Sequence, residues 1–426
     1  MTDARPLAGQ PWLRSAASRK VLRALEAHGR PARFVGGCVR DGLLGRTLPR
    51  ADLDLATPER PEQVMHLLDA AGVKAIPTGL DHGTVTAVVG NQRFEITTLR
   101  RDVATDGRHA EVAFTDDFEA DAARRDFTIN AMSCDAQGRL FDYFGGEADL
   151  AAGRIRFVGN PQTRIAEDYL RILRFFRFLA HYGREPGDPR ALAACKEAAP
   201  GLTRLSGERI QTEMLRLLAA QDPIPSLRLM ASGGVLHRVI PGPVAIGRLA
   251  RLLTLAPEAD PLLRLGALLR PPPADPGLIK SVARRWRLAN RDAARLEAIA
   301  GTALPALEAP GPERRRELYR LGPALYADLI RLVAAEVGEK AAQALAAALA
   351  QADLWRSPKL PLDGDDLLAE GLRPGPQLGK VLAAVETWWL ERDFAPDRAA
   401  CLAYARSLIA APTAAARAPR DRQAES

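Results

Sequence analysis

The sequence predicts an α+β N-terminal head, in which helices pack against a mixed sheet, followed by an all-α remainder. Two observations lead to this fold class. Residues 1–158 alternate between segments with the two-residue period of strands and segments with the period of helices. From about residue 160 the strand patterns stop, and helical periodicity continues between clusters of Pro and Gly without a fixed repeat.

The expected elements of the head follow in chain order. Helices are expected over Arg19–His28 and Pro61–Ala71. The dipeptides Gly90-Asn91 and Gln137-Gly138 predict tight turns between neighbouring strands. Strands are expected over residues 32–35, 52–56, 73–76, 82–89, 93–99, 129–134 and 140–143.

Length and composition limit the class of protein. A chain of 426 residues exceeds one ordinary core, so we expect several packed units. No apolar run approaches the roughly 18 residues that a membrane helix needs, and nothing indicates a protein partner. The net charge of +7 suits a polyanion but supports RNA binding only weakly. Four cysteines without CxxC spacing predict a reduced, cytoplasmic chain that lacks a structural zinc site.

The segment Phe34–Asp41 and the strand after it contain the first candidate site. Gly36 and Gly37 permit a sharp turn whose N–H groups can face a polyphosphate at the start of a helix. Asp52 and Asp54 lie two residues apart on one strand, so both carboxylates point to the same face. Such carboxylates repel each other without a cation, so we expect them to bind Mg²⁺. Taken separately, each pair is also typical of an ordinary turn or strand end; together they favour nucleotidyl transfer.

Two further segments can complete this site. Arg124 and Arg125, with Asp126 and Asn130 after them, can hold a triphosphate and a ribose. A charge cluster with internal ion pairs at the end of a helix explains the same pattern. Glu95, on a predicted hairpin strand, is either a third catalytic carboxylate or a solvated side chain.

The segment Glu167–Arg177 predicts one continuous amphipathic helix. Its apolar stripe consists of Ile165, Tyr169, Ile172, Phe176 and Leu179. A second ridge, at three-residue spacing, consists of Asp168, Arg171, Arg174 and Arg177.

Asp168 and Arg171 have the spacing of a surface ion pair, but they can also bind a nucleobase. Cytosine and adenine each place an amine beside an unprotonated ring nitrogen, which a carboxylate and a guanidinium can pair with. Uracil and guanine present the inverse pattern and would leave both side chains unpaired, which is costly in a buried site. The pair can therefore select CTP and ATP without a nucleic-acid template.

Together these motifs resemble the class II CCA-adding tRNA nucleotidyltransferases and their relatives, the bacterial poly(A) polymerases, which have a polymerase-β-like nucleotidyltransferase head. The matching segments occur in the order found in that family. They are Gly36–Asp41 with Asp52–Asp54, Phe94–Arg100, Thr105–Val112, Arg124–Met132, Glu167–Arg177 and Ser206–Ile210.

The resemblance implies a Mg²⁺-dependent enzyme that adds CCA to the 3′ end of tRNA from CTP and ATP and releases pyrophosphate. It also implies four parts. They are a catalytic head at residues 1–158, a nucleotide-selecting neck at 159–220, a helical body at 221–330 and a tRNA-binding tail at 331–410. Residues 411–426 are expected to be a disordered end.

Individual roles also follow from the resemblance. Asp52 and Asp54 match the metal ligands of the family, while Gly37, Arg40 and Arg125 match residues that contact the nucleotide phosphates.

The neck motif adds further nucleotide contacts. Glu167, Asp168 and Arg171 match the base-selecting positions, and Arg174 and Arg177 match additional contacts to the nucleotide.

Residues 105–112, which include Asp106 and Arg108, match a flexible loop whose presence argues against an enzyme that adds only CC. Three alternatives remain open. They are a poly(A) polymerase, an enzyme that adds only CC or only A beside a partner, and a catalytically inactive RNA-binding protein. The last alternative conflicts with the presence of Asp52, Asp54 and Arg125.

Overall fold

The computed structural model describes residues 6–46, 53–80, 83–105, 110–184, 186–270 and 275–410. The chain divides into two compact units: Met1–Ala250 with Ala259–Ala300, and Arg251–Glu258 with Gly301–Ser426. Within the described ranges the change from α+β to all-α is confirmed, because the last strand ends at Phe141. The finer division into head, neck, body and tail stays a prediction.

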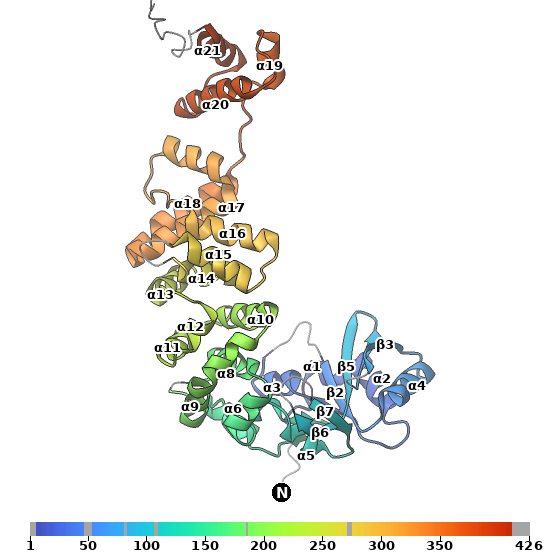
Figure 1. The fold of residues 1–426 in the computed structure, drawn as a ribbon. Coiled ribbons are helices and arrows are strands. Elements are labelled where there is room, and N and C mark those ends of the chain that lie inside the picture. The colour runs from blue at the N-terminus through green and yellow to red at the C-terminus, as the bar shows by residue number, and fades with distance from the viewer. Residues whose placement is uncertain are drawn as a thin grey trace, which may run out of the picture. The chain divides into compact units, whose positions relative to one another are not determined.

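A seven-stranded mixed sheet forms the centre of the head (Figure 1). The strands β2 and β5 are parallel, and every other pair of neighbours is antiparallel. The expected hairpin turn at Gly90 is confirmed, because Val89 pairs with Gln92. The order across the sheet is β3 (Lys74–Gly79), β4 (Thr84–Val89), β5 (Gln92–Thr98), β2 (Leu53–Thr57), β1 (Arg33–Val35), β8 (Ser133–Cys134) and β9 (Leu140–Phe141).

Helices flank this sheet. The two expected helices are confirmed as α2 (Ala16–Leu25) and α4 (Pro61–Ala70), which pack side by side, with α4 against β3, β4 and β5 (Figure 1). The Ser15 side chain accepts a hydrogen bond from the backbone N–H of Ser18 and so caps α2. The other head helices are α1 (Pro11–Arg14), α3 (Gly37–Leu43), α5 (Phe118–Ala123) and α6 (Gly146–Ala152).

The strand expected over residues 129–134 is largely wrong. The chain instead forms a 3₁₀ turn, η2 (Thr128–Asn130), before the short β8. The Asp126 carboxylate accepts hydrogen bonds from the Phe127 N–H (2.9 Å) and from Nδ2 of Asn130 (3.0 Å). These local bonds favour a turn because they compete with strand pairing.

A separate hairpin, β6 (Arg100–Thr105) and β7 (Ala110–Phe114), has no counterpart among the expected elements. Its strands flank the centre of the segment expected to be a flexible loop. Asp106 and Arg108 lie outside the described residues, and so do Asp52 and the expected disordered end at 411–426.

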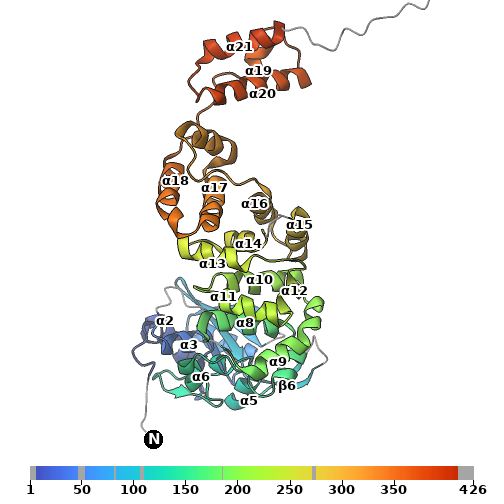
Figure 2. The same cartoon turned by 90° about the vertical axis from the view of Figure 1, so that its left-hand side faces the viewer.

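Helices make up the rest of the first unit. Figure 2 shows α8 beside α10 and α11, and α8 contacts both. The elements are α7 (Pro161–Glu167), α8 (Leu170–Tyr182), α9 (Pro189–Ala198), η3 (Ala199–Arg204), α10 (Gly207–Leu218), α11 (Ile224–Ser232), α12 (Val235–Val239), α13 (Ile246–Leu255), α14 (Pro261–Leu268), α15 (Pro276–Arg285) and α16 (Asn290–Gly301). The last residues of α13 and α16 belong to the second unit.

The continuous helix expected over residues 167–177 is wrong, because the chain breaks at Asp168. The helix α7 ends at Glu167, Asp168 is extended (φ −157°, ψ 108°), and α8 begins at Leu170. Oδ1 of Asp168 accepts a hydrogen bond from the Leu170 N–H (3.0 Å), which stabilises the break. The apolar stripe persists across it, since Ile165 and Ile172 are fully buried.

A cluster of phenylalanines attaches α8 to the head. The ring of Phe127 lies 4.8 Å from that of Phe157 and 5.2 Å from that of Phe178, while Phe157 stacks on Phe175 at 5.9 Å. All four rings are buried. Aromatic contacts of this kind add to the hydrophobic stabilisation, so they fix the face that α8 presents to the Arg124–Asn130 segment.

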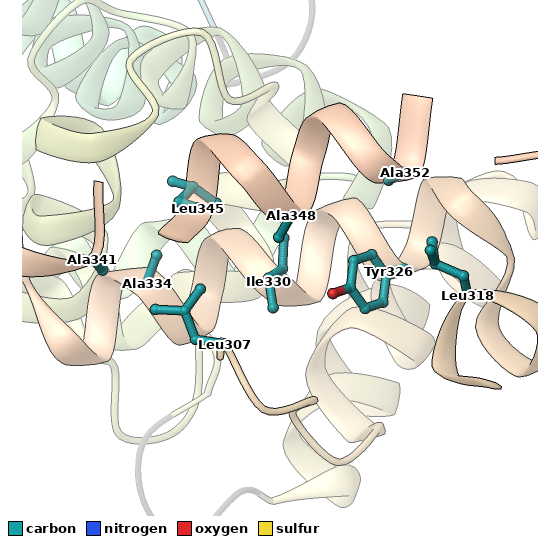
Figure 3. Close-up of a cluster of buried hydrophobic side chains, with 9 residues drawn as sticks. All are labelled: Leu307, Leu318, Tyr326, Ile330, Ala334, Ala341, Leu345, Ala348 and Ala352. Atoms are coloured by element: carbon teal, nitrogen blue, oxygen red, sulfur yellow. The ribbon is translucent and has the colours of Figure 1, made fainter. Parts of the chain in front are cut away.

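All regular elements among the described residues of the second unit are helices. The long helix α17 bends at Gly322 (φ 74°), directly before Pro323. Small alanines allow α18 to pack closely on α17 around Tyr326 (Figure 3). The elements are α17 (Gly311–Val337), η4 (Glu339–Ala341), α18 (Ala342–Leu354), α19 (Gly364–Ala369), α20 (Pro376–Glu391) and α21 (Arg398–Ala410).

Two tryptophans, one in the range expected to form the body and one in the range expected to form the tail, are core residues. Trp286 is fully buried and donates its indole N–H to the Val239 carbonyl (3.0 Å), and Trp389 is also buried. In the described part of the chain, no helix is both long and apolar enough to cross a membrane.

Candidate functional site

The central sheet forms one wall of a cavity of about 640 Å³. On this wall Asp54 of β2 lies in register with Glu95 of the parallel strand β5. Residues in register on neighbouring strands point to the same face, and both carboxylates line the cavity. The structure therefore brings Glu95 to Asp54, while Asp52 lies outside the described residues.

The turn between β1 and α3 completes the sheet wall. Gly36 has φ 71° and ψ −122°, a conformation that favours glycine. A Cβ atom at this position would lie 3.4 Å from Nη1 of Arg125 and 3.9 Å from Oδ2 of Asp54. Gly36 therefore lets the backbone turn beside both side chains, and Gly37 lines the same cavity.

Arg40 lies in the cavity wall with its guanidinium bonded to other residues of the protein. It donates to both carboxylate oxygens of Asp41 (3.2 and 2.9 Å), to Oδ1 of Asn130 (2.6 Å) and to the Tyr182 hydroxyl (2.7 Å). Its guanidinium carbon also lies 4.1 Å from the centre of the Tyr182 ring. Arg40 therefore connects α3 to η2 and α8, and its expected phosphate contact stays a prediction.

The buried carboxylate of Asp126 forms an ion pair with Arg174, whose side chain is 31 % exposed. Nε of Arg174 donates to Oδ2 of Asp126 at 2.6 Å. Burial alone would raise the pKa of the Asp126 carboxyl, but Arg174 and the Asn130 amide outweigh it, so the pKa lies below its usual range. Asp126 therefore stays ionised and orients Arg174, which lines the cavity.

Glu213 of α10 extends this network and was missing from the sequence-based site. Its carboxylate accepts a hydrogen bond from Nε of Arg177 (2.5 Å) and lies 3.8 Å from Nη1 of Arg174. The side chain of Glu213 is only 4 % exposed. The signal in the sequence was its position three residues after Ile210, on the buried face of the helix that the Ser206–Ile210 motif opens.

Arg124 and Arg125 were expected either to bind a nucleotide or to form ion pairs at the end of a helix, and their positions are compatible with both. Arg124 and Arg125 each form an ion pair with the buried carboxylate of Asp121, at 2.8 and 3.3 Å. Burial acts to raise the pKa of Asp121, but the two arginines lower it overall. Both arginines also line the cavity, as the nucleotide-binding hypothesis requires.

Asp168 and Arg171 both line the cavity, but each binds a different partner. Arg171 donates Nη1 to the Glu167 carboxylate and to the carbonyl of Arg164 (2.8 Å). Oδ2 of Asp168 accepts a hydrogen bond from Nη2 of Arg209 (2.6 Å) on α10. The expected surface ion pair between Asp168 and Arg171 is therefore replaced by two separate pairs.

The lining of the cavity is rich in arginine. Its lining includes four carboxylates: Asp54, Glu95, Asp126 and Asp168. It includes eight arginines: Arg40, Arg100, Arg124, Arg125, Arg171, Arg174, Arg177 and Arg216. Asp41, Asp121, Glu167 and Glu213 pair with five of these arginines from outside the lining, so the guanidinium groups are held at the cavity surface, where they suit a polyphosphate.

Arg100 and Arg216 are cavity residues that sequence reasoning did not select. Among the described residues no group of three or more His, Cys, Asp or Glu is arranged to hold a metal. The donors that could contribute to one on the sheet wall are Asp54 and Glu95.

Two protein-family models match parts of the chain. Residues 32–156 match the poly A polymerase head domain, and residues 188–246 match a probable RNA- and SrmB-binding site of polymerase A.

Curated relatives cover different lengths of the chain. The CCA-adding enzyme of Limosilactobacillus fermentum is 31% identical over 400 residues, which are 92% of this chain and 97% of that protein. Human mitochondrial CCA tRNA nucleotidyltransferase 1 is 51% identical over 189 residues, which are 44% of this chain and 43% of the human protein. The match therefore spans about half the length of the mitochondrial relatives.

Solved structures share the fold. The Bacillus stearothermophilus CCA-adding enzyme in complex with CTP is 28% identical, with a TM-score of 0.71 over 91% of this chain and 96% of that one. The Thermotoga maritima CCA-adding enzyme complexed with tRNA has a TM-score of 0.65 over 92% and 94% of the two chains. At 23% identity, this second likeness shows the fold alone.

Proposed function

We propose that this chain, which belongs to the family of CCA-adding enzymes and poly(A) polymerases, adds CCA to the 3′ end of tRNA from CTP and ATP. The observation that carries the proposal is a single arginine-rich cavity with paired carboxylates on one wall and base-pairing groups on the other. Asp54 and Glu95 line it beside Asp168 and Arg171. A CCA-adding enzyme aligned over 92% of this chain and a relative solved with CTP support the same activity.

Divalent metal is the cofactor of nucleotidyltransferases in this family, and we propose Mg²⁺ in particular. Asp54 and Glu95 fit it, because neighbouring carboxylate oxygens facing one cavity are the donors that Mg²⁺ prefers. With Asp52, they would hold the ion beside the phosphates. When bound, the ion lowers the pKa of the attacking hydroxyl and neutralises charge on the leaving group.

The residues of the cavity account for the remaining steps. Asp168 accepts a hydrogen bond from the exocyclic amine of cytosine or adenine, and Arg171 donates to the neighbouring ring nitrogen. The RNA 3′-hydroxyl attacks the α-phosphorus in line, and pyrophosphate leaves. Arg125 and Arg174, which acidic partners already orient, stabilise the negative charge of the phosphates.

A primer-extension gel tests the proposal. Purified protein is incubated with Mg²⁺ and a tRNA that lacks its 3′ CCA, with CTP alone, ATP alone or both. We expect two additions with CTP and a stop after three with both nucleotides. A long ladder with ATP alone would instead establish the poly(A) polymerase, which the matched head-domain model keeps as the second candidate. No extension under any condition would favour the inactive RNA-binding protein.

The cytoplasmic location also stays a prediction. Cys38, Cys134, Cys195 and Cys401 are buried, free thiols in the structure. Several relatives are named as mitochondrial proteins. Fractionation of the source cells with an antibody to the chain distinguishes the compartments.

A further inference from the structure

A second cavity, which we call the α2–α4 groove, lies between two helices that pack side by side on the head (Figure 1). Its volume is about 620 Å³, and its lining shares no residue with the cavity that contains Asp54. None of the described residues that line the groove is acidic. Its basic lining residues are Arg19, Lys20, Arg23, His28 and His66. The groove therefore concentrates positive charge away from the candidate active site.

The two arginines of the groove differ from the arginines of the other cavity. Around that cavity, carboxylates such as Asp121 and Glu213 hold the guanidinium groups. In the part of the chain that the structure describes, neither an ion pair nor a hydrogen bond joins the side chain of Arg19 or Arg23 to another residue. Both residues are exposed, so their charges are available to a ligand.

This charge opposes the local preferences of a helix. Arg19 lies in the first turn of α2, where the helix dipole favours negative charge, and that turn contains no acidic residue. Arg19 and Arg23 are one turn apart, so their charges repel each other. Glu26, Glu62 and Asp69 lie on or beside the same two helices but outside the lining. A sequence that violates local rules in this way is typical of a functional surface.

Two contacts between the walls of the groove hold it in place. Nζ of Lys20 donates to the carbonyl of Gly72, which follows α4 (3.0 Å). Nε2 of Gln63 on α4 lies 3.4 Å from Nδ1 of His28, which follows α2. A carbonyl is neutral, so the first contact fixes the ammonium group of Lys20 without removing its charge. The groove is therefore formed before a ligand binds.

We propose that the α2–α4 groove binds the phosphate backbone of an RNA strand, at a site separate from the nucleotide. All five basic residues of its lining are exposed, and an exposed cation binds one phosphate weakly. Such a surface favours a polymer that offers several phosphates at once and releases its counterions. Side chains one turn apart are separated by about 5–6 Å at Cβ, so Arg19 and Arg23 can contact successive phosphates of one strand.

The double variant Arg19→Gln/Arg23→Gln tests the inference in the full-length protein. Its affinity for a tRNA that lacks the CCA end is measured by fluorescence anisotropy over a series of salt concentrations. We expect Kd to rise about tenfold at low salt, and the slope of log Kd against log salt to fall by about 1.5, because two phosphate contacts are lost. CTP affinity in calorimetry, kcat at saturating tRNA and the denaturation midpoint should stay unchanged.

Arg139→Gln/Arg154→Gln is the matched control. These two arginines of the first unit are 55 % and 56 % exposed, and they lie beside the carboxylates of Asp135 and Asp149. The control removes the same number of charges, so its Kd for tRNA and its salt slope should equal those of the wild type. Equal losses in the two double variants would reflect net charge alone and would overturn the inference.

Two further outcomes bear on the occupant of the groove. An unchanged tRNA affinity in Arg19→Gln/Arg23→Gln would overturn the inference. Calorimetry with inorganic triphosphate tests for a free polyphosphate: a second site that the double variant loses, without a change in tRNA affinity, would also overturn it. The binding assay does not depend on catalysis. A wild-type protein that binds tRNA through the groove but extends no RNA would therefore refute the proposed function and support this inference.

Discussion

Arginine–carboxylate pairs occur in both compact units, but they differ in burial. Around the cavity of the first unit, Glu213 and Asp126 have side chains only 4 % and 9 % exposed. Their partners Arg177 and Arg174 are 13 % and 31 % exposed, whereas Arg398 and Arg406, which pair with Asp366 and Glu370 in the second unit, are 64 % and 59 % exposed. The pairs of both units consist of the same residue types, so they differ only in how far their side chains are buried.

The comparison shows which ion pairs fix the orientation of an arginine side chain. A buried carboxylate stays charged only beside a bonded cation, so each buried pair fixes the orientation of its arginine. An exposed pair competes with water and salt and fixes little. Two of the buried carboxylates, Asp126 and Glu213, hold arginines that line the cavity, so the orientation of these arginines is fixed there.

Asp54→Asn should have the largest effect on activity. It removes a charge from the sheet wall where we propose the metal, so extension of tRNA should fall about a thousandfold or more. The measurement is single-turnover extension with CTP. Glu62→Gln, which removes an exposed carboxylate from α4, is the control and should extend normally. Near-normal extension by Asp54→Asn would remove Asp54 from the catalytic site.

Glu213→Ala should have the largest effect on stability. It leaves the buried Arg177 guanidinium without its carboxylate, which typically costs about 3–5 kcal/mol in free energy of unfolding. Urea denaturation measures the loss. Glu370→Ala, which breaks the exposed pair with Arg406, is its counterpart in the second unit and should leave the midpoint unchanged. Equal shifts in the two variants would break the contrast between buried and exposed pairs.

The same structure shows which features can be predicted from the sequence. The strand-turn-helix segment at Gly36 and the helical second half depend on local pattern, and both agree with the structure. The pairing of Asp54 with Glu95 depends on two parallel strands 41 residues apart in the sequence, so their register needed the folded sheet. Glu213 was missed for a similar reason, since its partners lie on another helix.

The break at Asp168 illustrates a second limit. Helical periodicity continues through this residue, and the apolar stripe is buried on both sides of it. A side-chain bond to the Leu170 N–H decides the local conformation instead. Periodicity reports which face is buried, but it does not report whether the backbone between two turns is helical.

The pH dependence of the buried pair gives a smaller, graded effect. The folded-state pKa of Asp126 is lowered, so the stabilisation by its charge is present above the unfolded pKa of about 3.9 and is lost as pH falls through the folded value. The difference in unfolding free energy between wild type and Asp126→Asn should therefore shrink below about pH 4. A difference that stays constant from pH 7 to pH 2.5 would contradict the assignment.

Arg406→Gln should have the smallest effect. The Arg406 side chain is 59 % exposed, so water and salt reach the pair with Glu370. We therefore expect no measurable change in the denaturation midpoint or in its response to 0.5 M salt, a concentration of the order that screens exposed charges. A clear loss of stability would show that exposed pairs contribute more than the comparison allows.

The central claim is that one cavity of the first unit holds both the metal and the nucleotide. A crystal structure of the protein with CTP and Mn²⁺, read by its anomalous signal, tests this claim directly. We predict a metal peak beside Asp54 and Glu95, with the cytosine edge facing Asp168 and Arg171. A nucleotide bound elsewhere, or a metal away from both carboxylates, would contradict it.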